Sequence, residues 1–401
     1  MSTKTISHRV AVIGGGNAGI SLAARLRRAG MTDIGIIEPA ESHFYQPLWT
    51  LVGGGRAPAA ESMRTEASVM PQGVGWIKDR AQQIDPDTQT VTTEAGISVH
   101  YDHLVVAPGI QLDWDAIPGM AESLDTPTVS SNYRYDLTPK TWALIKRMRS
   151  GTAVFTMPAG PIKCAGAPQK IAYLAADYWR QQGVLDAVRI VLVLPTPAMF
   201  GVKVFSDELE RVVARYNIEV RKNSEVTAID PDTRSVTITD NAGQTTEELR
   251  YDLLHVVPRQ SAPDWIKASP IADPDNAGGY VQIDKNTLRH NRFDNIFALG
   301  DAGSSPNSKT GAAIRKQVPV VAANLQASLN GTPLPAKYGG YASCPVTTAR
   351  DKVLLAEFDY TMKPAPSIPL IDTTHERRDM WYLKRRGLPA MYWNLILTGR
   401  A

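Results

Sequence analysis

The sequence predicts an α/β fold with two Rossmann-like units, and three stretches of the chain are the basis for this prediction. Residues 8–28 have the pattern of a buried strand, a glycine-rich loop and an amphipathic helix. Residues 151–180 repeat the strand and the helix around a different loop. Near the C-terminus, an aromatic and basic stretch precedes the apolar run 388–397, which predicts a segment that associates with a membrane surface.

The composition of the 401 residues is that of a globular protein. Apolar residues make up 43% and charged residues 21%, and the length predicts two or three domains. The net charge of +3, without a block of Lys and Arg, argues against a nucleic-acid partner. Residues 1–10 lack the pattern of a secretory signal, and no run of 18 apolar residues predicts a transmembrane helix. The seven histidines are scattered without metal-ligand spacing, so we expect no metal.

The loop after the first predicted strand has the glycine spacing of a dinucleotide site. Gly14 allows a tight turn, Gly16 lets backbone N–H groups approach a pyrophosphate, and Gly19 permits close helix packing. The next predicted strand, 33–38, ends in Glu38, where a carboxylate can accept hydrogen bonds from an adenosine ribose. The residues predicted to contact a dinucleotide here are Gly14, Gly16, Asn17, Ala18, Gly19 and Glu38.

The second unit has no such glycine spacing. Its loop, 158–168, contains three prolines, which remove N–H donors, and the next predicted strand, 189–194, ends without an acid or an arginine. We therefore do not expect NAD(P)H to bind there. Cys164 lies in this loop beside Lys163 and ahead of a predicted helix, an environment that lowers a thiol pKa and favours the thiolate.

Cys344 is the second of only two cysteines, too few for a disulfide framework. Free cysteines are most often small buried hydrophobic residues, and that alternative applies to both. Cys164, however, replaces part of a phosphate loop, and Cys344 lies among Tyr and Pro residues in 341–345. This context favours a redox pair.

Two further segments resemble the glutathione-reductase-like flavoproteins and favour FAD as the dinucleotide. They are 101–109 (YDHLVVAPG) and 293–301 (FDNIFALGD), which is predicted to be a strand. In such proteins the aspartate equivalent to Asp301 binds the ribityl chain or the pyrophosphate. A helix that starts at 310–313 would direct its positive end towards reduced flavin. The resemblance implies these further FAD contacts: Gln46, Ala81, Pro108, Gly109, Asp301, Gly311, Lys316 and Gln317.

Segments spread over nearly the whole chain resemble the sulfide:quinone oxidoreductases, especially the branch that includes the mitochondrial enzyme. They are 43–55, 162–170 (IKCAGAPQK), 299–303, 343–345, 355–360 and 391–394. The cysteine-containing loop is the most specific of them. Other branches have a third cysteine that this sequence lacks.

The resemblance implies that hydrogen sulfide reduces FAD, that quinone reoxidises it, and that a small acceptor takes the sulfur. Hydrosulfide would attack a Cys164–Cys344 link, leaving a Cys164 thiolate and a Cys344 persulfide. Sulfite, glutathione, cyanide or another sulfide would then remove the outer sulfur. By position in the matching segments, the residues of a quinone pocket would be Phe358, Tyr360, Tyr392 and Trp393.

The tail is predicted to be a monotopic anchor, with Lys384, Arg385 and Arg386 available for anionic headgroups. The alternative is a terminal helix docked on the protein core. We expect a peripheral protein of the bacterial inner membrane, with weak anchoring that a homo-oligomer would strengthen.

We predict four chain divisions and keep three alternative functions. The divisions are an FAD-binding domain in two parts, 1–111 and 284–328, a second Rossmann-like domain, 112–283, and a C-terminal region that contacts quinone and membrane, 329–401. The alternatives are a single-subunit NADH:quinone oxidoreductase, the flavin subunit of a sulfide dehydrogenase, and a flavin-binding sulfur carrier without turnover.

Overall fold

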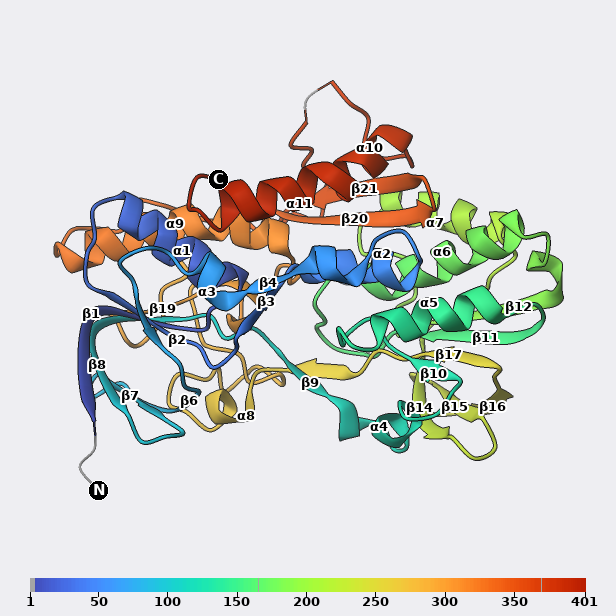
Figure 1. Ribbon diagram of the computed structural model, residues 1–401, viewed down its shortest axis with the longest axis horizontal. Coiled ribbons are helices and arrows are strands. Elements are labelled where there is room, and N and C mark those ends of the chain that lie inside the picture. The colour runs from blue at the N-terminus through green and yellow to red at the C-terminus, as the bar shows by residue number, and fades with distance from the viewer. Residues whose placement is uncertain (1–3, 165, 369) are drawn as a thin grey trace.

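The computed structural model describes residues 4–164, 166–368 and 370–401. Ala165, which belongs to the predicted cysteine loop, lies outside the described residues, as do residues 1–3 and 369. Figure 1 shows two sheet-containing lobes side by side, with the C-terminal segment running along one edge of both.

The first lobe is built on a seven-stranded sheet in the order β5-β2-β1-β8-β7-β6, with β19 also paired to β8. The pairings among β5, β2, β1, β8 and β19 are parallel, whereas those of β7 with β6 and β8 are antiparallel. The strands are β1 (Thr5–Ile13), β2 (Ile34–Ile37), β5 (Gly75–Ile77), β6 (Ala81–Asp85), β7 (Thr90–Thr93), β8 (Ser98–Val106) and β19 (Ile296–Ala298). The expected strand 293–301 is therefore shorter, and Asp301 lies in a 3₁₀ turn, Gly300–Ala302.

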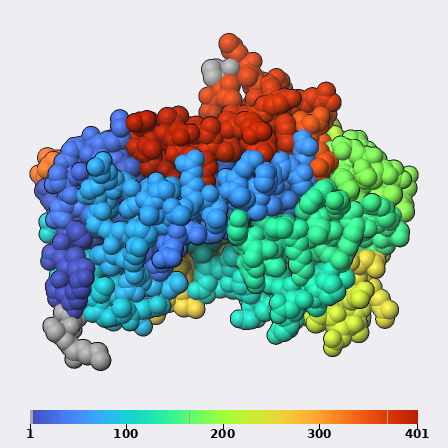
Figure 2. Space-filling view, viewed as in Figure 1, coloured from blue at the N-terminus to red at the C-terminus, as the bar shows by residue number. Residues whose placement is uncertain are grey.

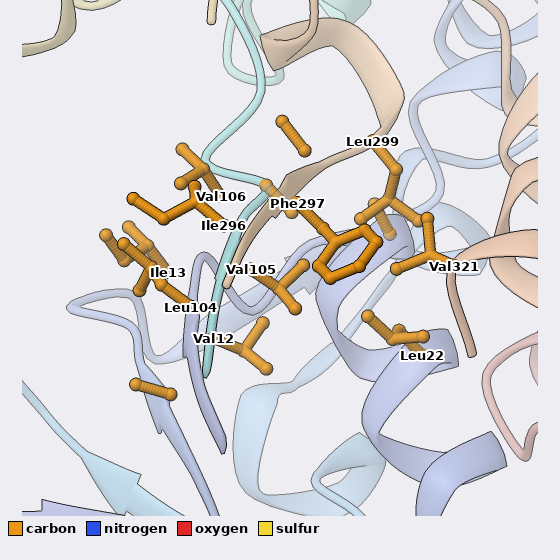
Figure 3. Close-up of a cluster of buried hydrophobic side chains, with 14 of the residues drawn as sticks. Val12, Ile13, Leu22, Leu104, Val105, Val106, Ile296, Phe297, Leu299 and Val321 are labelled. Atoms are coloured by element: carbon orange, nitrogen blue, oxygen red, sulfur yellow. The ribbon is translucent and has the colours of Figure 1, made fainter. Parts of the chain in front are cut away.

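Apolar runs in the parallel strands explain this sheet, because helices cover it and its strands need apolar side chains on both faces. The helices α1 (Asn17–Arg28) and α9 (Gly311–Leu329) supply much of that cover. Figure 3 shows Val12 and Leu104 from the strands close to Phe297 of β19, with Leu22 and Val321 from the two helices.

The second lobe contains a five-stranded parallel sheet in the order β10-β17-β11-β12-β13. Its strands are β10 (Val129–Ser130), β11 (Gly151–Thr156), β12 (Val188–Val193), β13 (Glu219–Arg221) and β17 (Leu253–His255). The accompanying helices are α4 (Met120–Ser123), α5 (Thr138–Arg147), α6 (Ala167–Gln181) and α7 (Lys203–Arg215). The short helix α8 (Asp264–Lys267) instead packs in the core of the first lobe. An antiparallel sheet follows, with β14 (Ser224–Asp230), β15 (Ser235–Asp240) and β16 (Thr246–Arg250). The pair β9 (Gln111–Asp113) and β18 (Arg259–Ser261) lies between the lobes in Figure 1.

The segment that follows β2 and the C-terminal region complete the fold. The former contains β3 (Ser42–Phe44), α2 (Trp49–Gly53), β4 (Met63–Thr65) and α3 (Glu66–Val69). The latter begins with the antiparallel hairpin β20 (Ala342–Ala349) and β21 (Lys352–Phe358). It ends in the helical segment 378–396, which includes α10 (Arg378–Tyr382) and α11 (Leu388–Met391) and which we call the tail helix.

The tail helix is docked on the protein, because its aromatic residues Tyr392 and Trp393 are buried against Tyr45 and Leu48. Figure 2 shows the C-terminal residues lying on the segment that follows β2. Among the described residues, no helix is both long enough and apolar enough to cross a bilayer.

We predicted that three basic side chains of the tail would be available for anionic headgroups, and this prediction is wrong for two of them. Lys384 is buried, and Arg385 forms a 2.7 Å ion pair with Glu61. Docking turns this side of the helix inward, so that only Arg386 of the three is exposed. The α/β fold itself is confirmed.

Candidate active site

The first glycine loop is shaped by close backbone contacts that exclude side chains. Gly14 has φ +100°, and a Cβ atom there would lie 2.4 Å from the Ala107 carbonyl oxygen. A Cβ on Gly19 would lie 1.9 Å from the Gly14 carbonyl oxygen. Glycine is therefore required both for the turn and for the packing of α1 against it. Pro108 and Gly109 come one residue after the end of β8, and the Pro108 Cα is 2.8 Å from the same Gly14 Cβ position.

The start of α1 offers open N–H donors. Gly16 is its N-cap, no described side chain caps the helix, and no described atom lies within 4 Å of a Cβ placed on Gly16. Asn17 and Ala18 form the first turn. Glu38 accepts hydrogen bonds from the N–H groups of Gly15 at 2.6 Å and Ala40 at 2.7 Å, and burial raises the pKa of its carboxyl. The loop thus has donors and space for a pyrophosphate, with a carboxylate beside them.

A second group of predicted residues surrounds the start of α9. Thr310 caps this helix by accepting from the Ala313 N–H at 3.1 Å, and Gly311 is its first residue. Gln317 is buried and accepts from the Gly300 N–H at 2.8 Å, whereas Lys316 is exposed and lies over the Tyr341 ring.

Asp301 lies near two lysines of the same region. Burial raises the pKa of its carboxyl, and the charges of Lys309 and Lys163 oppose that rise. Burial lowers the pKa of each of these lysines to about 8. Lys163 also donates to Gln46 Oε1 at 2.8 Å, which places Gln46 beside the cysteine loop. Ala81, by contrast, is buried at the start of β6.

In the second loop, protein groups already accept the hydrogen bonds of several backbone N–H donors. The Ala159 N–H donates to Glu225 Oε1 at 3.1 Å, and the Lys163 N–H donates to Gln260 Oε1 at 2.9 Å. The Cys164 N–H donates to the Lys309 carbonyl at 2.8 Å. A carboxylate thus occupies a position where a nucleotide phosphate would need donors, which disfavours NAD(P)H at this loop.

The fold brings the two cysteines together although they lie 180 positions apart in the sequence. Their sulfur atoms are 2.8 Å apart, so a small side-chain movement would let them bond. Cys344 is buried on β20, and Cys164 is half-buried in the loop. Cys164 has φ +55°, a left-handed conformation that non-glycine residues rarely adopt and that is often found at functional sites.

Two lysines make the environment of the cysteines positive. Lys170 Nζ donates to Cys164 Sγ at 3.1 Å. The hydrogen bond from Cys344 and the charges of Lys170 and Lys384 lower the pKa of Cys164 well below the ordinary value, against the effect of burial. The same hydrogen bond and burial raise the pKa of Cys344. The contact with Lys170 therefore favours the thiolate on Cys164 rather than on Cys344.

Sequence reasoning missed both lysines as site residues. Lys170 lies one turn into α6 within the segment 162–170, so its place after the loop was a usable signal. Lys384 had no such signal, because only docking of the tail helix brings it near the cysteines. Burial lowers the pKa of Lys384 to about 7, with Lys170 acting in the same direction.

The four aromatic residues predicted for a quinone pocket do not gather in one place. Phe358 packs with Phe200 in the core of the second lobe, and Tyr360 packs against Tyr338 beside the first. Only Tyr392 and Trp393 contact each other, in the cluster beneath the tail helix. The four side chains belong to three separate hydrophobic clusters, and a quinone pocket that includes all four stays a prediction.

The open glycine loop and the paired cysteines define a class of protein, the disulfide-handling flavoproteins. A family model described as pyridine nucleotide-disulphide oxidoreductase matches residues 8–316. The mitochondrial sulfide:quinone oxidoreductase of Mus musculus is 39% identical over 395 residues, which are 98% of this chain and 87% of the relative. That of Dictyostelium discoideum is 40% identical over 395 residues, 98% of this chain and 86% of the relative. The chain belongs to the sulfide:quinone oxidoreductase family.

A solved structure supports the fold. The sulfide:quinone oxidoreductase of Aquifex aeolicus superposes with a TM-score of 0.80 at 22% identity, covering 99% of this chain and 92% of the other. Both relatives are named as mitochondrial enzymes. The comparisons therefore do not support our expectation of a bacterial inner membrane.

The cofactor of the enzyme is FAD, and the residues fit it. The open N–H donors at Gly16 suit the pyrophosphate, Glu38 suits a ribose, and half-buried Asp301 with the start of α9 would hold the flavin half. Among the described residues, no group of three or more His, Cys, Asp or Glu side chains could hold a metal ion.

Proposed function

We propose that this chain oxidises hydrogen sulfide at the Cys164–Cys344 pair, passes the electrons through FAD to quinone, and passes the sulfur to a small acceptor. The observation on which this depends is the pair itself. Its sulfur atoms lie 2.8 Å apart, with Cys164 in the loop that replaces a second nucleotide site and Cys344 on β20, and Lys170 contacts the more acidic thiol.

The thiol pKa values assign the two sulfurs different roles. Hydrosulfide attacks the Cys344 sulfur of the disulfide, the Cys164–Cys344 bond breaks, and a new S–S bond forms on Cys344. The electron pair of the broken bond leaves on Cys164, whose thiolate Lys170 stabilises. Attack at this sulfur is favoured because the lower-pKa thiolate is the better leaving group.

Regeneration of the disulfide releases the electrons. A small nucleophile such as sulfite, glutathione, cyanide or a second sulfide removes the outer sulfur and leaves Cys344 as a thiolate. The two thiolates then re-form their bond and give up two electrons. When bound, FAD would supply the two-electron redox chemistry that links this electron pair to quinone. Comparing turnover with each nucleophile in turn identifies the acceptor.

For contact with a membrane surface, we propose exposed apolar side chains in place of the basic cluster. Leu370 is fully exposed, and Tyr382 and Leu395 are exposed on the tail helix. The segment between β21 and α10 projects beyond the tail helix in Figure 1. This apolar surface is small, so a homo-oligomer would strengthen binding by presenting several copies. Leu370→Ser should reduce co-sedimentation with lipid vesicles, and unchanged binding would contradict this assignment.

We also propose that the chain divides at the predicted boundaries, 1–111 with 284–328, 112–283, and 329–401. The strands of the first sheet come from 5–106 and 296–298, which supports joining the first two segments into one FAD-binding domain.

The experiment that tests the proposed reaction is an anaerobic titration of the purified protein, followed by the flavin absorption band. We expect sulfide to bleach the band in the wild type, a short-chain quinone to restore it, and Cys164→Ser to abolish bleaching. NADH should leave the band unchanged. Bleaching by NADH, or by sulfide in Cys164→Ser, would contradict the proposal and favour the NADH:quinone alternative or another route of reduction.

A further inference from the structure

Glu66 is a buried acid that the proposed reaction does not use. It is the first residue of α3, the residue is 1% exposed, and its Oε1 has no hydrogen-bond partner among the described residues. A Cβ placed on Gly15 would lie 2.6 Å from this oxygen and 2.6 Å from Cγ of Glu38. Two carboxylates from different elements therefore face the middle of the dinucleotide loop.

The other oxygen of Glu66 connects the loop to the tail helix. Glu66 Oε2 lies 3.2 Å from Nδ1 of His43, and Nε2 of His43 lies 2.6 Å from the Tyr392 hydroxyl. The donor in each of these two hydrogen bonds depends on the tautomer of His43. All three side chains are buried.

The unpaired oxygen of Glu66 requires a donor, because a buried acceptor without a partner is unfavourable. Both oxygens of Glu38 already accept backbone N–H groups, so Glu38 alone does not explain why a second acid is buried here. The adenosine half of FAD has ribose hydroxyl groups, and the acid at the end of the second strand marks where that ribose binds.

We propose that Glu66 is a second carboxylate acceptor for a hydroxyl group of the adenosine half of FAD, and that His43 and Tyr392 couple this contact to the docking of the tail helix. The inference depends on FAD as the cofactor and is independent of sulfide chemistry. Coupling between two sites is reciprocal, so bound FAD stabilises the docked tail and the docked tail slows the release of FAD.

The test measures FAD release from the holoenzyme after dilution, followed by flavin fluorescence, in Glu66→Gln, Tyr392→Phe and the double variant. Glutamine has one acceptor oxygen, so it cannot offer one acceptor oxygen to His43 and another to a cofactor hydroxyl, as glutamate can. We expect release to be about tenfold faster in Glu66→Gln and about threefold faster in Tyr392→Phe. The double variant should be no faster than Glu66→Gln, because the two residues act through one contact.

Tyr382→Phe is the matched control, since Tyr382 is an exposed tyrosine on the same helix. Its release rate should equal that of the wild type. Release from Glu66→Gln within twofold of the wild type would overturn the FAD contact, and additive effects in the double variant would overturn the coupling.

Hydrogen exchange supplies a second readout that a purely local role for Glu66 would not change. In Glu66→Gln holoenzyme, amides 392–396 should exchange faster, although the substitution lies outside the tail helix. Unchanged exchange there would overturn the coupling. If Glu66→Gln does not fold, Tyr392→Phe, which removes one hydroxyl group, still tests whether the tail affects FAD release.

Discussion

The two strand–loop–helix units of this protein have the same local architecture and opposite chemistry. After β1, the turn at Gly14 and the open helix start at Gly16 leave N–H donors free for a phosphate. After β11, Glu225 and other protein groups accept from the loop, and Cys164 adopts a left-handed conformation. The chemistry of such a unit depends on which backbone donors its loop leaves open.

The second unit still provides a positive environment, and this environment stabilises a thiolate. In the first unit the anion is the phosphate of a cofactor, stabilised by backbone N–H groups. In the second it is the sulfur of Cys164, stabilised chiefly by Cys344 and Lys170. Side chains have therefore replaced backbone donors as the source of anion stabilisation.

The largest effect that would sharpen this comparison is expected from Cys344→Ala. Loss of the sulfur that hydrosulfide attacks should slow sulfide-dependent flavin reduction by about 1000-fold or more, while the FAD content stays normal. Stopped-flow absorbance and the ratio of flavin to protein test both parts. Loss of FAD together with activity would show that the two loops are not independent.

The complementary change in the first loop is Gly14→Ala. The added Cβ would meet the Ala107 carbonyl oxygen, and alanine would have to adopt φ +100°. We expect the free energy of unfolding to fall by about 3 kcal/mol and FAD to be lost, as measured by urea denaturation and flavin content.

Gly30→Ala separates the effect of backbone strain from the effect of the steric contact with Ala107. Gly30 has φ +90°, but a Cβ there meets no described atom within 4 Å. It should lower the free energy of unfolding by only about 1 kcal/mol, the effect of backbone strain alone. An equal loss at both positions would mean that the contact with Ala107 is unimportant.

These contrasts also show how far sequence reasoning reached. Both strand–loop–helix units, the acid Glu38 and the position of Cys164 in the second loop could be predicted, because each depends on residues close together in the chain. The contacts of Lys384, Glu66 and Tyr392 could not, because they form only when the tail helix docks across the first lobe. Lys384 in particular belongs to a basic cluster typical of a lipid-binding surface, and only tertiary packing buries it beside the cysteines.

Lys170→Met tests the positive environment of the second loop with a smaller effect. Interaction with the thiolate raises the pKa of Lys170 above its ordinary value despite burial, so its charge is present throughout the neutral range. In the reduced enzyme, the substitution should raise the pKa of Cys164 and slow its alkylation by iodoacetamide at neutral pH by about tenfold. An unchanged alkylation rate would contradict the ion pair.

Lys384→Met should have the smallest effect, and its size should depend on pH. Burial lowers the pKa of Lys384 to about 7, so this lysine is largely charged at pH 6 and largely neutral at pH 9. At pH 9 a neutral side chain replaces a neutral one, and alkylation of Cys164 should change little. At pH 6 the substitution removes a charge that favours the thiolate, so alkylation should slow by about threefold.

Lys170→Met is the control, because it removes a charge at both pH values. An effect of Lys384→Met that is equal at pH 6 and pH 9 would mean that Lys384 stays charged, and that the docked tail leaves it better solvated than its burial implies.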